Sequence, residues 1–430
     1  MGMTLKLLVA GLCVALMGCS GGTGADGNPD AGAGGAGGAG RGGGADAGQG
    51  GSDGGVPDAG PPGMPTVTPA PEFDSDIFRQ WATLVELADG RVFVAGGFII
   101  RSPPGGGTAR GTGREEIEIF DVANRTYVEV APLKQGRLGA SSVLLADGKV
   151  LVTGGAGGPP GEIAESLDSA ELFDPLTGET TLLPETMNIA RRHHGSWLLA
   201  SGRYAGKVLI AGGATRGAPE LYDPATRMFT PLGAANAPPG GLDGYSVLLD
   251  DEQVVFIGTQ SELDVDHRGY HRYDPEAGAF DDLGIFTDSD YSRYTVTKQH
   301  DGRVLIAGGA TDFQGSANLA FFDPSDDSLG HFGKHLNGRR YLHSAGVLPS
   351  GRVALISGYS MLGEDGAIST VAIWDPVAET VTDAAGEVSV GRAYSQALTL
   401  TSGQIFVIGG QVVLARGNTA IVANVDIISE

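Results

Sequence analysis

Short apolar runs separated by turn-forming residues recur along the chain after about residue 65. The clearest run ends in paired glycines and occurs at RVFVAGG (91–97), KVLVTGG (149–155), KVLIAGG (207–213), RVLIAGG (303–309) and QIFVIGG (404–410). Two weaker copies keep one glycine each, at Gly258 and Gly358. Short apolar runs bounded by Gly, Pro, Asn and Asp are typical of β-strands. The pattern therefore predicts an all-β fold built from repeats.

Each copy contains the same four segments in the same order. An apolar strand such as 141–145 is followed by a tight turn such as Ala146-Asp147-Gly148, and the glycine-pair strand comes next. After a loop of variable length, a third strand ends in Asp-Pro, as at 170–175, and a fourth resembles 126–131. Proline presets φ and the Asp side chain caps the backbone, so Asp-Pro starts a turn. Four short antiparallel strands per repeat of this length predict one propeller blade.

These repeats resemble the kelch repeat, in particular the bacterial variety similar to the central domain of galactose oxidase. The first positions of the glycine pairs, 96, 154, 212, 258, 308, 357 and 409, differ by 58, 58, 46, 50, 49 and 52 residues. The resemblance covers residues 66–430, although the fourth strands lack the usual tryptophan. It implies a seven-bladed β-propeller of four-stranded antiparallel blades. The alternative is a six-bladed ring with one degenerate copy.

The two ends of the repeat region predict how the ring closes. After Gly410 one more strand fits, around residues 420–428, so the last blade lacks its outer strand. The segment 66–73 precedes the first inner strand and can supply the missing one. Closure of this kind would leave no open sheet edge between the first and last blades.

The N-terminus carries a predicted export signal. Residues 1–6 hold one cation, and 7–17 form an apolar run too short to span a bilayer permanently. The run closes with Leu16-Met17-Gly18-Cys19, which resembles the lipobox of bacterial lipoproteins. That resemblance implies a signal peptide over 1–18 and acylation of Cys19, which would anchor the chain in a membrane. Ser20 after the anchor favours the outer membrane, with a periplasmic or surface-exposed orientation. A plain signal peptide with a chance cysteine is the alternative.

Residues 19–65 are predicted to be a disordered tether between this anchor and the repeats. They consist largely of Gly, Ala, Asp and Pro with few larger apolar residues. Such a segment cannot bury enough apolar surface to offset its conformational entropy. The chain is therefore divided into a signal peptide (1–18), a tether (19–65) and a kelch propeller (66–430).

Charge and cysteine content exclude several function classes. Acidic residues number 51 and basic residues 28, for a net charge of −23. This balance argues against a nucleic-acid partner, because phosphate contacts need clustered Lys and Arg. The two cysteines are Cys13 and Cys19. Galactose-oxidase-like enzymes use copper with a tyrosine cross-linked to a cysteine, so that chemistry is not expected, and no cofactor is predicted.

The repeats place cations where the inner strands begin. In blade topology the variable loops and the crossings between blades share one rim of the disc, which we call the loop rim, and the tight turns share the other. Function usually resides in variable loops on a rigid scaffold. Registering the copies on their turns aligns five arginines at this position, with Gly241 and Tyr291 in the other two copies. The aligned arginines are Arg79, Arg137, Arg191, Arg340 and Arg392, and His194 and His343 follow three residues after two of them.

Two interpretations of these arginines stay open. They could bind a carboxylate or sugar-acid ligand through forked hydrogen bonds, with His194 and His343 nearby. Alternatively, they could pair with Glu118, Glu171 and Glu220, which recur three residues before the third-strand Asp. Repeated positions in a repeat protein are most often part of the scaffold.

A weaker candidate site lies in the fourth copy. His267 and His271 are four residues apart among acidic residues, and on an extended strand both imidazoles would share a face. This spacing makes them weak candidates for a metal site, whereas a solvated acidic loop is the favoured interpretation.

The sequence as a whole favours a membrane-anchored, monomeric binding module of the cell envelope, with a protein or carbohydrate partner on the loop rim. One alternative is a cofactor-free carbohydrate-active enzyme, since a periplasmic sialic-acid mutarotase shares the kelch fold. Another is an envelope scaffold without a binding pocket.

Overall fold

The computed structural model describes residues 63–69, 80–101, 110–158, 164–213, 217–235, 245–261, 264–285, 292–311, 314–360, 367–414, 418–422 and 424–430. The chain divides into two compact units, 1–62 and 63–430. The predicted signal peptide, Cys19, most of the tether and Arg79 lie outside the described residues. None of the described helices is long and apolar enough to cross a membrane.

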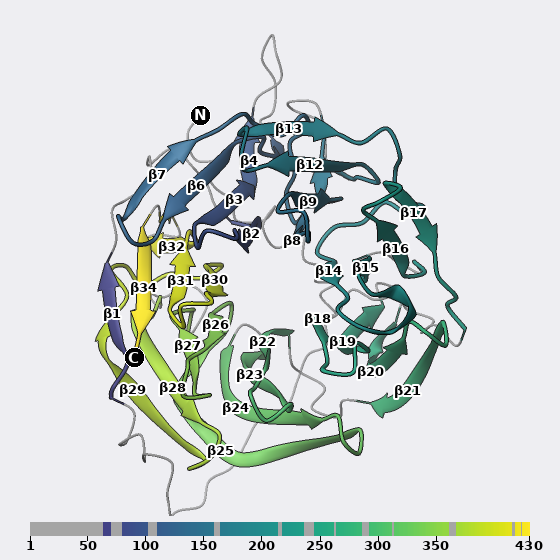
Figure 1. Ribbon diagram of the computed structural model, residues 1–430. Coiled ribbons are helices and arrows are strands. Elements are labelled where there is room, and N and C mark those ends of the chain that lie inside the picture. Colours follow the sequence, from purple (N-terminus) through teal and green to yellow (C-terminus); the bar gives the residue numbers. More distant parts are fainter. Residues whose placement is uncertain are drawn as a thin grey trace, which may run out of the picture. The chain divides into compact units, whose positions relative to one another are not determined.

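The repeat region is an all-β propeller of four-stranded antiparallel blades, as the pattern of apolar runs predicts. Five blades are separate sheets, each with its strands in chain order from the axis outward (Figure 1). The first three are β2 (Ala82–Glu86), β3 (Val92–Gly96), β6 (Ile117–Asp121), β7 (Thr126–Glu129); β8 (Ser141–Leu144), β9 (Val150–Thr153), β12 (Ala170–Asp174), β13 (Glu179–Leu182); and β14 (Gly195–Leu198), β15 (Val208–Ala211), β16 (Glu220–Asp223), β17 (Met228–Pro231).

The next two blades have longer strands. They are β18 (Tyr245–Leu248), β19 (Val254–Ser261), β20 (Asp264–Asp274), β21 (Ala279–Ile285); and β22 (Ser292–Lys298), β23 (Val304–Thr311), β24 (Gln314–Asp323), β25 (Ser328–Arg340). In every blade the second strand is the most apolar, and β3, β9 and β15 are buried along their whole length. A strand buried on both faces reads as a continuous apolar run, which explains the repeated sequence motif.

The remaining blade strands form one eight-stranded sheet. Its order is β26 (Ser344–Val347), β27 (Val353–Ile356), β28 (Thr370–Asp375), β29 (Thr380–Glu387), β1 (Thr66–Pro69), β34 (Val425–Ser429), β31 (Ile405–Ile408) and β30 (Gln396–Thr399). Strand β1 pairs antiparallel with β34 over four residues, from Thr66↔Ser429 to Pro69↔Asp426. It meets β29 through the single parallel pair Thr66↔Ala385. The prediction that the N-terminal segment supplies the outer strand beside the last one is confirmed.

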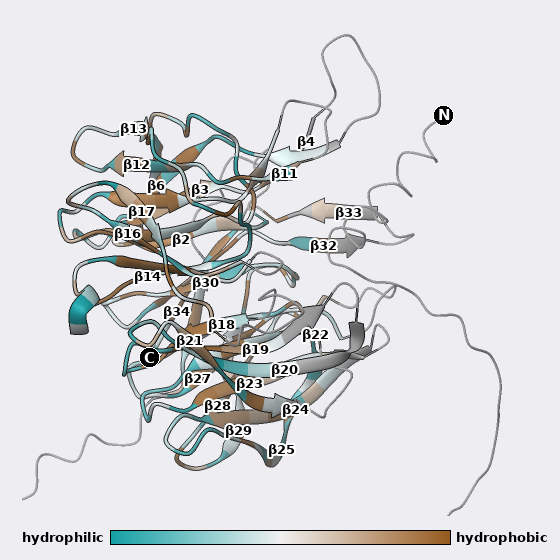
Figure 2. Ribbon diagram, turned by 90° about the vertical axis from the view of Figure 1, so that its right-hand side faces the viewer, coloured by the Kyte–Doolittle hydropathy of each residue, from teal (hydrophilic) through white to brown (hydrophobic). Residues whose placement is uncertain are grey.

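Extra hairpins project from the loop rim. The three pairs are β4 (Phe98–Arg101) with β5 (Arg110–Gly113), β10 (Ala156–Gly157) with β11 (Glu165–Ser166), and β32 (Gln411–Leu414) with β33 (Asn418–Ile421). Figure 2 shows β4, β11, β32 and β33 on one side of the disc, and the turn between β12 and β13 on the other. The loops that vary in length between copies therefore do lie on one rim.

Apolar clusters fill the spaces between neighbouring sheets. Val152 and Phe173 pack against Phe93 and Ile119 of the preceding blade, and equivalent clusters follow around the ring. One cluster joins Phe120 of the first blade to Phe406 of the β30–β34 part of the eight-stranded sheet. Another joins the β26–β29 part to the β30–β34 part. Burial between faces is thus the main apolar contribution to stability.

Removal of β1 should destabilise the propeller. A chain that starts at residue 70 loses the four antiparallel pairs with β34, and its free energy of unfolding should fall by about 2–4 kcal/mol. The exposed edge of β34 should also promote association. Urea unfolding and size-exclusion chromatography measure both effects. A chain that starts at Gly63 is the matched control, and equal unfolding midpoints for the two chains would contradict the expectation.

Candidate functional site

The aligned arginines lie where the chain crosses from one blade to the next. Of the five, four are described, and all four are buried: Arg137, Arg191 and Arg392 have no exposed surface, and Arg340 retains 2%. Each precedes an inner strand, namely β8, β14, β26 and β30. The fifth, Arg79, is outside the described residues.

Arg137 shows the pattern of contacts most completely. Its Nε donates to Glu171 Oε1 at 3.0 Å, and its Nη1 donates to the carbonyl oxygens of Gly154 at 2.7 Å and Ser169 at 3.0 Å. Its own carbonyl accepts a 2.8 Å hydrogen bond from Gly97 of the preceding blade. The arginine therefore connects the glycine pairs of two successive blades.

The same connection recurs around the ring. Arg191 Nη1 donates to Gly212 O at 3.0 Å, while Gly155 N donates to Arg191 O at 2.8 Å. Its Nε is 3.1 Å from Glu220 Oε1. Arg392 pairs with Asp426 at 2.7 Å, and its carbonyl accepts from Gly358 N at 2.8 Å.

In each of these contacts the arginine side chain is bonded to other groups of the protein itself. Burial lowers the pKa of Arg137 and of Arg191, and the charges of Glu171 and Glu220 oppose that shift. A buried charge is stable only when it is paired and hydrogen-bonded. The contacts favour the scaffold interpretation of Arg137, Arg191 and Arg392, and ligand binding by any of the aligned arginines stays a prediction.

His194 and His343 also lie at the blade interfaces. His194 Nε2 is 2.8 Å from Thr153 Oγ1 of the preceding blade, and His343 Nε2 is 2.9 Å from Thr295 Oγ1. Both side chains are buried. Burial, together with Arg191 beside His194 and Arg340 beside His343, lowers the pKa of each imidazole to about 3. Both rings are therefore neutral at neutral pH and serve as hydrogen-bond partners between blades.

A second set of equivalent positions lies two residues after the arginines. Six of these are described, and all have a left-handed backbone with φ between 54° and 64°. Backbone hydrogen bonds connect neighbours, from Gly139 N to Trp81 O at 2.8 Å, from His193 N to Gly139 O at 2.7 Å and from Tyr394 N to Leu342 O at 2.9 Å. We call this set the axial ring; its described members are Trp81, Gly139, His193, Arg293, Leu342 and Tyr394.

Aromatic side chains of the axial ring gather around Trp81. The Trp81 ring centroid is 5.7 Å from those of Phe98 and His193 and 6.1 Å from that of Tyr394, all with edge-to-face geometry. Trp81 and Tyr394 are partly buried, and His193 is exposed. The left-handed region favours glycine, as at Gly139, and a bulky residue there costs free energy. The hydrogen-bonded ring itself does not need these aromatic side chains.

The proposed histidine pair receives no support as a metal site. His267 lies in β20, but its side chain is outside the description. His271 is buried, with its Nε2 3.8 Å from Asp282 Oδ1, and burial lowers its pKa. Over the described ranges, no group of three or more His, Cys, Asp or Glu side chains is placed to hold a metal ion.

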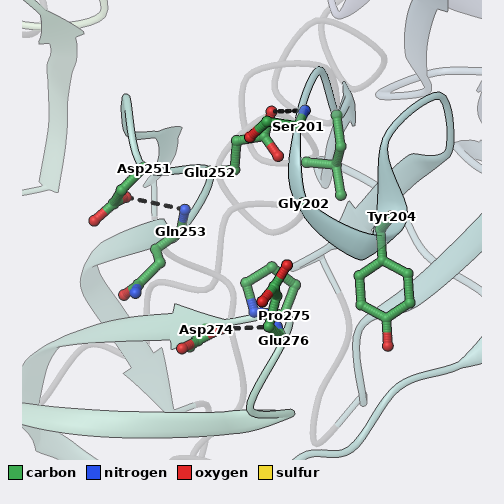
Figure 3. A pocket seen from close by; sticks show the side chains of 10 residues that line it. Ser201, Gly202, Tyr204, Asp251, Glu252, Gln253, Asp274, Pro275 and Glu276 are labelled. Carbon is green, nitrogen blue, oxygen red and sulfur yellow. Dashed lines mark hydrogen bonds between the residues drawn. The ribbon is translucent and has the colours of Figure 1, made fainter.

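A shallow hollow lies on the tight-turn rim, between the third and fourth blades (Figure 3). Its volume is about 140 Å³, and it is bordered by Asp251, Glu252, Asp274 and Glu276. Their carboxylates accept backbone hydrogen bonds, as from Ser201 N to Glu252 and from Arg203 N to Glu276. Ligand sites usually enclose several hundred cubic ångströms. This hollow is part of the turn structure.

Comparison with solved structures supports the fold. A fungal alcohol oxidase of the AA5 family, solved in complex with copper, matches 84% of this chain and 76% of its own with a TM-score of 0.61 and 18% sequence identity. This identity shows the fold alone, a galactose oxidase-like β-propeller. No protein-family description and no curated protein sequence matches the chain.

The residues of this chain do not fit the copper site of the galactose-oxidase-like enzymes. That site needs a cysteine beside a ligand tyrosine, and the two cysteines here, Cys13 and Cys19, precede every propeller strand. The buried His194 and His343 each direct Nε2 to a threonine hydroxyl. The likeness is one of fold, and fold does not imply chemistry.

The axial ring is not among the sites predicted from the sequence. Trp81, His193 and Tyr394 each follow an aligned arginine by two residues, so the same register contained the signal. The left-handed backbone that distinguishes these positions has no signature when the residue is Trp, His or Tyr.

Loss of a buried ion-pair partner should be costly. Glu171→Gln leaves the Arg137 guanidinium without a charge partner, and the free energy of unfolding should fall by about 3–5 kcal/mol. Asp223→Asn, which breaks the partly exposed pair with Lys207, is the control and should have a much smaller effect. Equal losses in chemical denaturation would contradict the buried-pair account.

The two interface histidines should make stability depend on pH. Their folded pKa of about 3 lies below the usual 6.5, so the unfolded chain binds more protons between these values. Their contribution to stability should therefore be full well above pH 6.5 and decline progressively as the pH falls from 6.5 toward 3. The double variant His194→Gln, His343→Gln should show a flatter decline in thermal midpoint over that window. A slope identical to that of the parent would contradict this assignment.

Proposed function

We propose that the protein is a binding module whose recognition surface is the loop rim around the propeller axis, centred on Trp81, His193 and Tyr394. The observation that carries this proposal is the placement of three aromatic side chains at left-handed positions of the axial ring. Each of the three retains some solvent exposure. Backbone strain of this kind concentrates at functional sites. Aromatic residues are also the usual anchors of binding surfaces.

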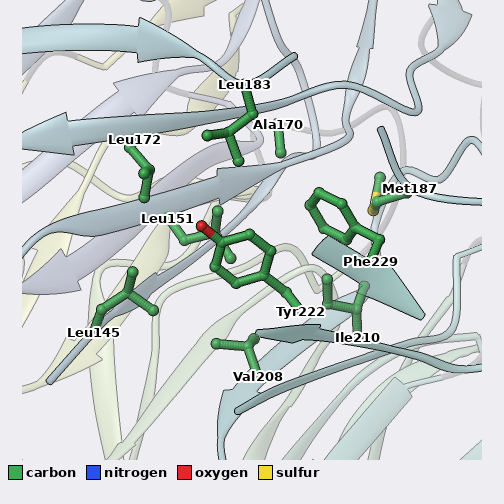
Figure 4. Packing of buried hydrophobic residues seen from close by; sticks show 10 residues of the cluster. All are labelled: Leu145, Leu151, Ala170, Leu172, Leu183, Met187, Val208, Ile210, Tyr222 and Phe229. Atoms are coloured by element: carbon green, nitrogen blue, oxygen red, sulfur yellow. The ribbon is translucent and has the colours of Figure 1, made fainter. Parts of the chain in front are cut away.

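We infer that the propeller has seven blades. The β26–β29 and β30–β34 parts of the eight-stranded sheet enclose an apolar cluster that includes Ile356, Val371, Ile405 and Val407. This arrangement matches the packing between separate blades, as in the cluster around Tyr222 between the second and third (Figure 4). The two parts are therefore the sixth and seventh blades, joined at their outer edges by one residue pair.

The cellular context of the proposal comes from the sequence. The lipobox-like segment ending at Cys19 supports a lipid anchor in the cell envelope, in the outer membrane, with the propeller on a tether. The resemblance to kelch repeats supports a protein or carbohydrate as the partner. The net charge of −23 disfavours polyanions.

Binding at the axial ring should depend on Trp81. Residues 63–430 are screened on an array of immobilised neutral and acidic glycans, and hits are quantified by calorimetry. Trp81→Ala should weaken binding at least about tenfold, equivalent to ~1.4 kcal/mol. Leu176→Ala, at a fully exposed position on the tight-turn rim, is the control and should bind normally.

NMR of each bound sugar separates recognition from catalysis. Binding without chemical change supports the proposal, whereas turnover of a sugar would favour an isomerase. Unchanged affinity in folded Trp81→Ala would place the site elsewhere.

A further inference from the structure

Arg340 lacks the carboxylate partner that the other three described members of the aligned arginines have. Arg137, Arg191 and Arg392 each have a carboxylate partner on the third strand of their blade, at 2.7–3.0 Å. In the first two of these blades the partner lies three residues before the Asp of the Asp-Pro turn. In the sixth blade that position is Ala372, three residues before Asp375. The repeat thus lacks its acidic partner here.

Two of the remaining contacts of Arg340 match those of Arg137. Arg340 Nη1 donates to Ser357 O and Thr370 O, both at 3.3 Å, where Arg137 Nη1 donates to Gly154 O and Ser169 O. Arg340 Nη1 also donates to Leu355 O at 2.9 Å, a contact without a counterpart at Arg137, so the guanidinium lies near the equivalent place but is shifted toward the second strand. Its Nε, which in Arg137 and Arg191 donates to the carboxylate, has no acceptor among the described residues.

The charge of Arg340 is poorly compensated. The side chain is 2% exposed, and burial lowers its pKa to about 10, opposed only by the more distant charge of Asp383. Arg392 also has an Nε without an acceptor in the described part of the chain, but it keeps a 2.7 Å ion pair with Asp426. A buried cation without an anionic partner is strongly unfavourable.

In the other blades, the surroundings of the third-strand carboxylate favour a negative charge. In the equivalent copies a backbone N–H from the crossing segment also donates to it, from Lys134 to Glu171 at 2.6 Å, and from Asn188 to Glu220 at 2.7 Å. Ser389 N donates to Asp426 in the same way at 3.0 Å. Alanine in place of glutamate removes the carboxylate group and one methylene group from this place.

We propose that a monovalent anion the size of chloride binds beside Arg340 Nε, in the place that a third-strand carboxylate occupies in the other blades. Ala372 has no exposed surface and belongs to an apolar cluster with Leu336 and Leu355, so an anion beside it is enclosed and must be small. A single guanidinium balances one negative charge, which excludes phosphate and sulfate as dianions. An unsatisfied buried polar group in a folded protein commonly marks an ion or water.

Bromide, which scatters anomalously and resembles chloride, tests the site directly. Crystals of residues 63–430 grown in sodium bromide should show an anomalous peak within hydrogen-bond distance of Arg340 Nε. The thermal midpoint should be higher in sodium chloride or bromide than in sodium gluconate at equal ionic strength, because an ion that binds the folded state stabilises it.

Two variants make the assignment specific. Ala372→Glu supplies the missing carboxylate, and it should abolish both the bromide peak and the chloride dependence of the midpoint. Glu171→Ala is the matched change in the second blade, and it should create a second bromide peak beside Arg137 and a stronger chloride dependence.

The outcomes separate the proposal from its alternatives. Wild-type protein with no peak at Arg340, or with a midpoint indifferent to chloride, overturns it, as would be expected if a carboxylate of the chain itself filled the place. A peak without any stabilisation identifies an adventitious ion only and also overturns it. If Ala372→Glu does not fold, the wild-type crystal and Glu171→Ala still decide. Glycan binding at Trp81 is independent of all these results.

Discussion

The aligned arginines and the glycine pairs together connect one blade to the next. The arginine carbonyl accepts from the second glycine of the preceding blade, and its guanidinium returns to the first glycine of its own blade. A side chain on the glycine would prevent this approach, because a Cβ at Gly96 would lie 2.3 Å from Arg137 O and one at Gly154 would lie 2.4 Å from Arg191 O. Both glycines also have positive φ. The glycine pair therefore recurs in the sequence because the contact between neighbouring blades requires it.

Because this connection holds the blades together, the side chains of the axial ring can differ from blade to blade. The axial ring is held by its backbone hydrogen bonds, so its side chains can be Gly139 in one blade and Trp81, Arg293 or Tyr394 in others. A uniform scaffold thus presents a non-uniform set of side chains around one axis. A similar separation appears at Arg340, where two of the guanidinium contacts persist although the acidic partner is absent.

The propeller architecture could be predicted from the sequence because the residues that end each strand act locally. Asp-Gly turns, glycine pairs and Asp-Pro turns each impose a backbone geometry on their own residues, and their register gave the blade strands and the pairing of β1 with β34. The candidate site was harder. Whether Arg137 faces a ligand or Glu171 depends on side-chain direction across the sheet, which spacing does not specify. The aromatic group around Trp81 joins residues more than 300 positions apart, and only ring closure brings Tyr394 beside Trp81.

The pairing of the first and last strands determines on which rim of the disc the propeller begins. Thr66 pairs with Ser429, at the end of β34, and Gly63 O accepts from Arg352, which follows the tight turn between β26 and β27. The first described residue of the propeller, Gly63, therefore lies on the rim of tight turns. The projecting hairpins and Trp81, which packs against Phe98 of β4, are on the opposite rim, so the strand that closes the ring does not cover them.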